Sequence, residues 1–262
     1  MNMTQPSYEF LKVQYADPLA FVCLNRPAKR NAISDPLVAE LRRAFETMPE
    51  FVRAIVLHAE GEHFCAGLDL SEMRERGTVE AMHHSRMWHA AFEEIQFGRA
   101  PVVAVLKGAT IGGGLELASA CHVRVAEESA FFALPEGSRG LFVGGGASVR
   151  VPRLIGVARM ADMMLTGRVY SAKEGYDAGI AQYLVGNGEG LAKARELAER
   201  IAQNSPTTNY AVTHVLPRIA DQSIQDGLLT ESLMASVALS DPQTQDRLAA
   251  FLEHKAGRVM PK

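Results

Sequence analysis

The sequence of 262 residues is long enough for one large domain or two small ones. Hydrophobic residues make up 47% and charged residues 22%, as in soluble globular proteins, and no apolar run approaches the roughly 18 residues of a membrane helix. The 27 basic and 30 acidic residues are mixed along the chain and give a net charge of −3, which argues against nucleic-acid binding. The N-terminal residues carry no secretory or organellar signal, so we expect a cytoplasmic protein without a membrane segment.

The first part of the chain predicts strands that alternate with helices. Leu19 to Leu24 predicts a strand, and a helix is expected to begin near Ser34, with a serine or aspartate cap and an early proline. The apolar run Ala54 to His58 predicts a second strand. It leads to Ala66-Gly67, a small backbone that a ligand can approach closely, beside Asp69 in the first turn of the next helix.

Neither the histidines nor the cysteines follow the pattern of a metal site. Val79 to Phe97 is expected to be mostly helical, and its adjacent His83 and His84 would face different sides, with His89 further along. The three cysteines are an odd number without paired metal spacing, so we expect reduced, packed thiols. The sequence therefore predicts no bound metal.

The stretch Pro101 to Glu116 carries the clearest local pattern. Its β-branched run Val102 to Leu106 predicts a buried strand, and three glycines, 112 to 114, lead directly into an apolar segment with helical spacing. Glycines there bring backbone N–H groups close to a ligand at the positive end of the helix dipole. Glu116 adds a carboxylate beside those donors, which suits proton transfer next to a developing negative charge. These residues alone leave open a simple tight turn with a solvated Glu116.

A second carboxylate follows at Glu136, after a short strand expected at Ala130 to Leu134. Strand pairing could return Glu136 to the cavity of Glu116. A second glycine triplet, 144 to 146, then opens another donor-rich helix. From residue 157 onward the sequence predicts helices, among them Thr207 to Ile219 and Pro242 to Lys255. We therefore expect strands and helices in two layers, followed by a helical tail.

In their order and spacing these motifs resemble the crotonase superfamily of enoyl-CoA hydratases and isomerases, over nearly the whole chain. The resemblance is carried by LNRPAKRNAIS, HFCAGLDL, PVVAVLKGATIGGGLELASACHVRVA, FFALPEG, VGGGAS and MLTGRVYSAKEGYDAGI. It implies an α/β fold, with a β/α spiral of two roughly perpendicular sheets and flanking helices in residues 1 to 200. A helical C-terminal region, 201 to 262, would pack on neighbouring subunits of a homotrimer or hexamer. The implied substrate is an acyl-CoA, with coenzyme A as part of the substrate and no further cofactor.

The resemblance also implies a role for individual residues, carried over from the family by position. The backbone N–H groups of Leu68 and Gly113 would form an oxyanion hole for the thioester oxygen. Glu116 would be the catalytic base and Glu136 the catalytic acid, with the backbone of Gly144 helping to seat the water between them. Close like charges and a dry pocket would keep one of the two carboxyls protonated.

The resemblance also predicts contacts to coenzyme A. The expected contacts are Lys29, Arg30, Ala66, Asp69, Phe251 and Lys255. The basic pair among them could hold phosphates, or could simply be solvated in its loop. Two departures from the family pattern bear on these contacts: Ser71 stands where many relatives carry a basic residue, and His254 aligns with a family lysine that a neighbouring subunit supplies. We therefore expect the contacts to coenzyme A to differ from those of the relatives.

Having both carboxyls favours water addition, because family members that only move a double bond typically keep the second carboxyl and replace the first. The resemblance therefore implies syn hydration of a 2-enoyl-CoA through an enolate held in the oxyanion hole. Other acyl-CoA chemistry stays open: hydration followed by thioester hydrolysis or release of a β-substituent, or double-bond isomerisation. A third alternative is non-catalytic binding of coenzyme A esters or RNA, against which the acidic charge balance argues.

Overall fold

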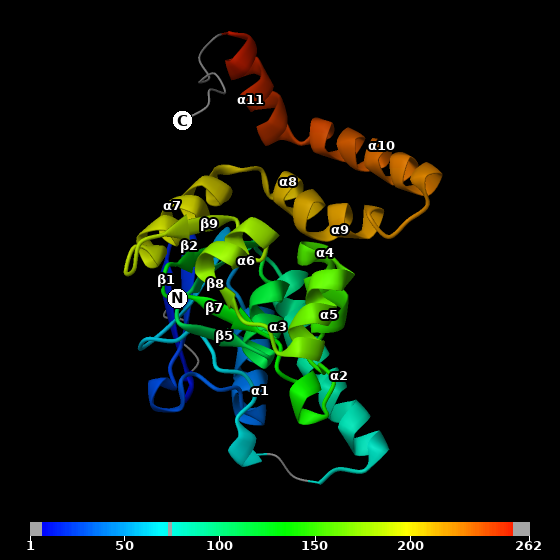
Figure 1. Cartoon of the computed structure of the whole chain (residues 1–262). Helices are drawn as coiled ribbons and strands as arrows, with labels where there is room; N and C mark the ends of the chain where they lie inside the picture. The colour runs from blue at the N-terminus through cyan, green and yellow to red at the C-terminus, as the bar shows by residue number, and fades with distance from the viewer. Residues whose placement is uncertain (1–6, 73–74, 254–262) are drawn as a thin grey trace. The chain divides into compact units, whose positions relative to one another are not determined.

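The computed structural model describes residues 7 to 72 and 75 to 253. The chain divides into two compact units, Met1–Arg200 and Ile201–Lys262, each of which is described by itself. Figure 1 shows both sheets of the protein in the first unit, whereas the described residues of the second unit form helices and turns.

A six-stranded sheet forms the centre of the first unit. Its strands are β1 (Leu11–Ala16), β2 (Leu19–Leu24), β3 (Ala54–Ala59), β4 (Val102–Leu106), β6 (Val123–Glu127) and β9 (Tyr183–Val185), in the order β1-β2-β3-β4-β6-β9. β1 pairs antiparallel with β2, and the other neighbouring pairs are parallel. β2 and β4 are buried along their whole length, which explains why they are continuous apolar runs in the sequence.

A smaller sheet determines where the functional loops lie. It contains β5 (Ala109–Ile111), β7 (Phe131–Ala133) and β8 (Tyr170–Ser171), in the order β5-β7-β8. β5 and β7 are parallel and in register from Ala109 with Phe131 to Ile111 with Ala133. Because parallel strands end at the same edge of a sheet, the turn after β5 and the turn after β7 lie side by side.

Seven α-helices of the described chain begin in the first unit. They are α1 (Asp35–Glu46), α2 (Thr78–Gln96), α3 (Gly113–Ala120), α4 (Ala147–Ile155), α5 (Val157–Thr166), α6 (Ala172–Ala178) and α7 (Gly190–Gln203). Ser34 caps α1 by accepting the Leu37 N–H at 3.3 Å, so the cap predicted there is confirmed, and Ser171 forms a capping box with Glu174 at α6. All eight residues of α3 are buried.

The second unit follows the end of α7. It contains α8 (Pro206–Tyr210), a π-helical turn (Ala211–Val215), α9 (Leu216–Ile219), α10 (Ile224–Ser240) and α11 (Pro242–Leu252). The predicted helical stretch from Thr207 to Ile219 is therefore confirmed, with a π-helical turn inside it. Pro217 has no N–H to donate to the preceding turn, which accounts for the wider turn there. The last helix was predicted to reach Lys255, which lies outside the described residues.

Two sheets with flanking helices confirm the α/β fold that the resemblance implies. The sequence did not predict strands β1, β5, β8 and β9. β5, β8 and β9 have two or three residues each, too few to show a period of two, and β1 is an edge strand in which buried and exposed positions alternate. Within residues 7 to 72 and 75 to 253, no helix is both long and apolar enough to cross a membrane.

Candidate active site

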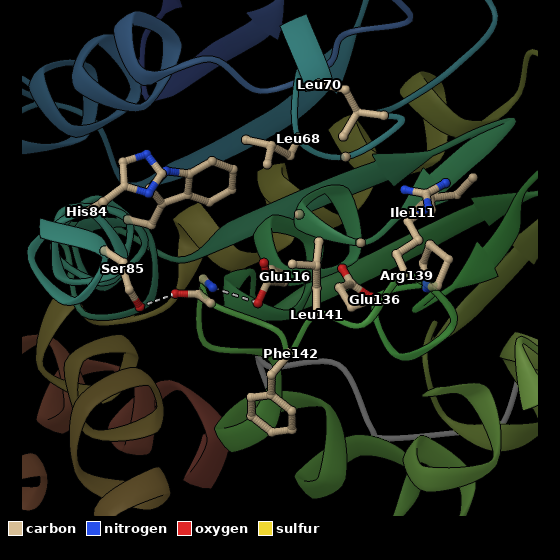
Figure 2. Close-up of a pocket in the computed structure, with 18 of the residues that line it drawn as sticks. Leu68, Leu70, His84, Ser85, Ile111, Glu116, Glu136, Arg139, Leu141 and Phe142 are labelled. Carbon is tan, nitrogen blue, oxygen red and sulfur yellow. Dashed lines mark hydrogen bonds between the residues drawn. The ribbon is translucent and has the colours of Figure 1, made fainter. Parts of the chain in front are cut away.

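A cavity of about 490 Å³ lies in the first unit, where four segments of the chain meet (Figure 2). The segments are the loop 66 to 70, the first half of α2, the β5–α3 turn, and residues 135 to 145 after β7. The pairing of β5 with β7 joins two of them, and the Gly112 N–H donates to the Ala133 oxygen at 2.9 Å. Mostly apolar walls surround two acidic side chains, Glu116 and Glu136. The cavity therefore combines a dry lining with two titratable groups.

Two backbone N–H groups, those of Leu68 and Gly113, come together at this cavity. A Cβ atom built on Gly113 would lie 3.6 Å from the Leu68 nitrogen, and one built on Gly67 would lie 3.6 Å from the Gly113 nitrogen. The Gly67 oxygen and the Asp69 N–H both pair with Ile33, at 2.7 and 2.8 Å, so the intervening Leu68 N–H points to the other side. Gly113 begins α3, where the first N–H groups have no partner within the helix. Both donors are therefore available to a ligand oxygen.

The glycines of the β5–α3 turn are required by close packing. Gly112 has a φ of +53°, and a Cβ there would lie 2.7 Å from Glu136 Oε1. A Cβ on Gly114 would lie 2.3 Å from the Cys65 oxygen, and one on Gly113 would lie 2.9 Å from the Trp88 ring. Side chains here would push the two amides and the carboxyl apart.

Glu116 is held by backbone amides in a buried position. It is 4% exposed, and its Oε1 accepts the N–H groups of Gly145 at 2.7 Å and Ala147 at 3.1 Å. Burial raises the pKa of Glu116, while these amides, the charge of Arg150 and the Gly146 amide oppose that rise. The carboxyl is thus surrounded by groups that stabilise its ionised form.

Glu136 enters the same cavity from a different environment. Figure 2 shows its carboxyl beside that of Glu116. Its Oε2 is buried and has no hydrogen-bond partner among the described residues. Burial is the main cause that raises the pKa of Glu136, and the charge of Glu116 raises it further. Both carboxyls therefore have a raised pKa, but Glu116 is held by two amide N–H groups, whereas Glu136 Oε2 has no partner among the described residues.

The glycine loop 144 to 146 completes the cavity. Ser85 Oγ on α2 donates to the Gly144 oxygen at 2.6 Å, and Arg150 Nη1 on α4 donates to the Gly145 oxygen at 3.1 Å. The sequence pointed to Gly144 and to the segment that ends at Trp88, but not to Arg150 or to the bond between Ser85 and Gly144. Ser85 and Trp88 lie three residues apart on one helix, and this spacing was the available signal for a shared face. No local pattern in the sequence pointed to Arg150, because it contacts the site through a backbone oxygen.

The expected contacts to coenzyme A are distributed unevenly. Ala66 lines the cavity, and Lys29 and Arg30 are exposed in and after the short helical turn Pro27–Lys29. The Asp69 carboxylate accepts hydrogen bonds from within the protein. Ser71 donates to it through Oγ at 2.6 Å and through its N–H at 3.1 Å, and Arg26 Nη2 donates at 2.9 Å. These bonds lower the pKa of Asp69 to about 2.

The remaining two predicted contacts belong to the C-terminal part. Phe251 is exposed on α11 in the second unit, and Lys255 lies outside the described residues. Among residues 7 to 72 and 75 to 253, no group of three His, Cys, Asp or Glu side chains could hold a metal ion. His84, which lines the cavity, pairs with Asp35: its Nε2 lies 2.6 Å from Asp35 Oδ1.

Comparisons with known proteins identify relatives along the whole described fold. A family model described as enoyl-CoA hydratase/isomerase matches residues 15 to 258. A probable enoyl-CoA hydratase of Mycobacterium bovis is 30% identical over 252 residues, which cover 95% of this chain and 97% of the relative. A probable enoyl-CoA hydratase of Bacillus subtilis is 32% identical, with coverage of 88% and 90%.

Solved structures agree with these relatives. A Rhodopseudomonas palustris protein described as a candidate enoyl-CoA hydratase is 57% identical, has a TM-score of 0.92 and covers 96% of this chain and 98% of its own. An enoyl-CoA hydratase of Bacillus anthracis is 30% identical, with a TM-score of 0.88 and coverage of 95% and 98%. The matched region includes every segment that lines the cavity. The chain therefore belongs to the enoyl-CoA hydratase/isomerase family, and is an enzyme of the crotonase superfamily, whose members act on acyl-CoA substrates.

Proposed function

We propose that the protein hydrates a 2-enoyl-CoA by syn addition of water. The observation that carries the proposal is the pairing of two carboxyls in unlike environments, beside two amides that are free to bind an oxygen atom. Glu116 accepts two N–H groups, while Glu136 keeps a buried oxygen without a partner. Environments that separate the pKa values of neighbouring carboxyls are the usual way to obtain one acid and one base.

The N–H groups of Leu68 and Gly113 would bind the thioester oxygen. When a nucleophile adds to the β-carbon, negative charge moves onto this oxygen and an enolate forms. Two preorganised amides, one at the start of α3, would stabilise that charge in a mostly apolar cavity. Loss of one such donor typically raises the barrier by about 2.7 to 4 kcal/mol.

Glu116 would take a proton from water, and Glu136 would give a proton to the α-carbon. The amides around Glu116 favour the carboxylate form, which a base requires. The unpartnered Oε2 of Glu136 favours the protonated form, because an O–H group is less costly to bury than a charge. The backbone of Gly144 would help to seat the water between the two carboxyls. After turnover the proton on Glu116 returns to Glu136 by exchange with solvent, so both groups are restored.

Other reactions of the family would use the same carboxyls and backbone amides. A plain isomerase would move the double bond without adding water, and a hydrolase or β-eliminating hydratase would release coenzyme A or a β-substituent. The first carboxyl, the amide-bound Glu116, is the feature that favours hydration over isomerisation.

Two further expectations stand as proposals. Coenzyme A would be part of the substrate, with Lys29 and Arg30 near its phosphates, and no other cofactor would be needed. The exposed apolar side chains of the second unit, for example Leu229 and Leu233 on α10, would pack against neighbouring copies in a homotrimer or hexamer.

A panel of 2-enoyl-CoA esters with different chain lengths, aromatic groups and β-substituents tests the proposal. We expect at least one ester to gain the mass of one water, with coenzyme A still attached. Products that retain the substrate mass with a shifted double bond, or that lack coenzyme A, would replace hydration by one of the other reactions. Unchanged esters throughout would leave only binding.

A further inference from the structure

The loop between Gly144 and Ala147 is hydrogen bonded on both of its sides. The peptide group that joins Gly144 to Gly145 accepts from Ser85 Oγ through its oxygen, at 2.6 Å, and donates to Glu116 Oε1 through its N–H, at 2.7 Å. Figure 2 draws these two bonds on either side of one peptide. A hydroxyl, a peptide group and a carboxylate therefore form one continuous chain of hydrogen bonds.

The next peptide group is held in a similar way. Arg150 Nη1 donates to the Gly145 oxygen at 3.1 Å, and Arg150 Nε is fixed by Gln96 Oε1 at 2.7 Å. The N–H of this peptide belongs to Gly146, whose amide lowers the pKa of Glu116. A cation therefore acts on the carbonyl end of a peptide whose other end stabilises the carboxylate.

We propose that Ser85 and Arg150 are positioning residues that act through two consecutive peptide groups to keep Glu116 ionised. A donor at the carbonyl oxygen polarises a peptide and makes its N–H a stronger donor. The same bonds fix the direction of the N–H groups toward the carboxylate. The role of Glu116 as base rests on the proposed function, whereas the effect on its ionisation does not.

The direction in which the pKa of Glu116 changes follows from the groups around it. Those that face it or its supporting loop are Arg150 on α4, Glu136 after β7, and His84, His89 and Glu93 on α2. Burial lowers the pKa of His89, whose Nε2 lies 3.4 Å from Ser85 Oγ. Arg150 is thus the cation that opposes the effect of burial on Glu116. Removal of Ser85 or Arg150 raises the pKa of Glu116, and the acid limb of activity moves to higher pH.

Direct titration of Glu116 tests this inference. Isotope-edited infrared spectra of protein with labelled glutamate, compared with spectra of Glu116→Gln, isolate the carboxylate band of Glu116. We expect its midpoint to rise by roughly half a pH unit in Ser85→Ala, since one polarising bond is lost. It should rise by about one unit in Arg150→Gln, where a nearby charge is lost as well. The acid limb of kcat/KM should move by the same amounts.

Matched variants separate this role from a structural one. Ser85→Thr keeps the hydroxyl and should keep the wild-type midpoint. Ser236→Ala removes another serine hydroxyl that donates to a backbone oxygen, that of Ser232 at 2.9 Å, and should change nothing. Ser85→Ala improves helix propensity, so it gives a folded protein even where Arg150→Gln does not.

Each result decides a separate question. An unchanged Glu116 midpoint in folded Ser85→Ala overturns the inference, whatever happens to turnover. A raised midpoint in a protein that hydrates no enoyl-CoA supports the inference and rejects the proposed function. A fall in turnover that Ser85→Thr does not restore, without a shift of midpoint, assigns Ser85 to packing alone.

Discussion

Glu116 and Glu136 line one cavity from regions that are built very differently. Glu116 lies in α3, whose eight residues are all buried, and its carboxyl receives two loop amides. Glu136 lies in a partly exposed turn, next to exposed Gly137, and its Oε2 has no partner among the described residues. The comparison teaches how surroundings alone would assign opposite proton roles to two identical side chains in the proposed hydration.

Removal of either carboxyl is the strongest way to break this comparison. Glu116→Gln and Glu136→Gln should each lower kcat for hydration by at least about 100-fold, because each removes one proton-transfer group. Steady-state kinetics on the ester preferred in the panel measure the loss. Glu199→Gln, an exposed position on α7, is the control and should retain full activity. Near-normal turnover in both active-site variants would contradict the assigned roles.

A change in the β5–α3 turn disturbs the amides and leaves both carboxyls in place. Gly114→Ala puts a Cβ 2.3 Å from the Cys65 oxygen, so the turn must move. We expect a loss of about 100-fold in kcat/KM through the misplaced Gly113 N–H, and a cost of about 1 to 3 kcal/mol in stability. Gly77→Ala, where a Cβ meets nothing within 4 Å, is the control for kinetics and thermal melting. Full activity in Gly114→Ala would show that this turn does not place a catalytic donor.

A third carboxyl sharpens the comparison, because its pKa moves the other way. Hydrogen bonds from Ser71 and Arg26 lower the pKa of Asp69 from 3.8 to about 2. A folded-state pKa below the unfolded one means that Asp69 stabilises the protein above pH 3.8 and loses this contribution as the pH falls toward 2.

Asp69→Asn should therefore lower the free energy of unfolding at pH 7. The difference from wild type should shrink as denaturant titrations are repeated at decreasing pH from 3.8 to 2. A difference that is constant over this range would mean that the charge of Asp69 is not what holds the loop.

The smallest expected effect concerns the charge beside Glu136. Arg139 lines the cavity mouth and lowers the pKa of Glu136, so Arg139→Leu should raise that pKa and move the alkaline limb of activity to higher pH. Arg139 is exposed, and salt screens its charge, so we expect less than about a threefold change in kcat/KM at any pH. The shift should diminish in high salt, whereas a shift independent of salt would assign Arg139 a contact with substrate.

Much of the fold could be predicted from the sequence, because its signals are local. Buried strands such as Val102 to Leu106 and the serine caps of α1 and α6 depend on a few neighbouring residues. The interruption near Pro217 and the three-residue strands β5 and β9 depend on longer-range context. The short β5–β7 pairing is nevertheless the contact that brings Glu136 to Glu116.

The residues of the active site also divide into those that could be predicted from the sequence and those that could not. Glycines and carboxyls at fixed spacing could be recognised, since close approach and acid–base chemistry restrict the residue type. Ser85, Gln96 and Arg150 could not, because they act on backbone oxygens and on one another from two helices. Asp69 stays a predicted contact to coenzyme A, and the bonds of its carboxylate to Arg26 and Ser71 are ones that no local pattern reveals.

One labelling experiment tests most directly whether the two carboxyls share the hydration of a thioester-activated double bond. The preferred enoyl-CoA is incubated with the enzyme in water that carries heavy oxygen and, separately, in heavy water, and the products are analysed by mass and NMR. We expect one heavy oxygen at the β-carbon and one deuteron at the α-carbon, added to the same face, and neither label with Glu116→Gln. A product that moves its double bond without taking up heavy oxygen would contradict the account.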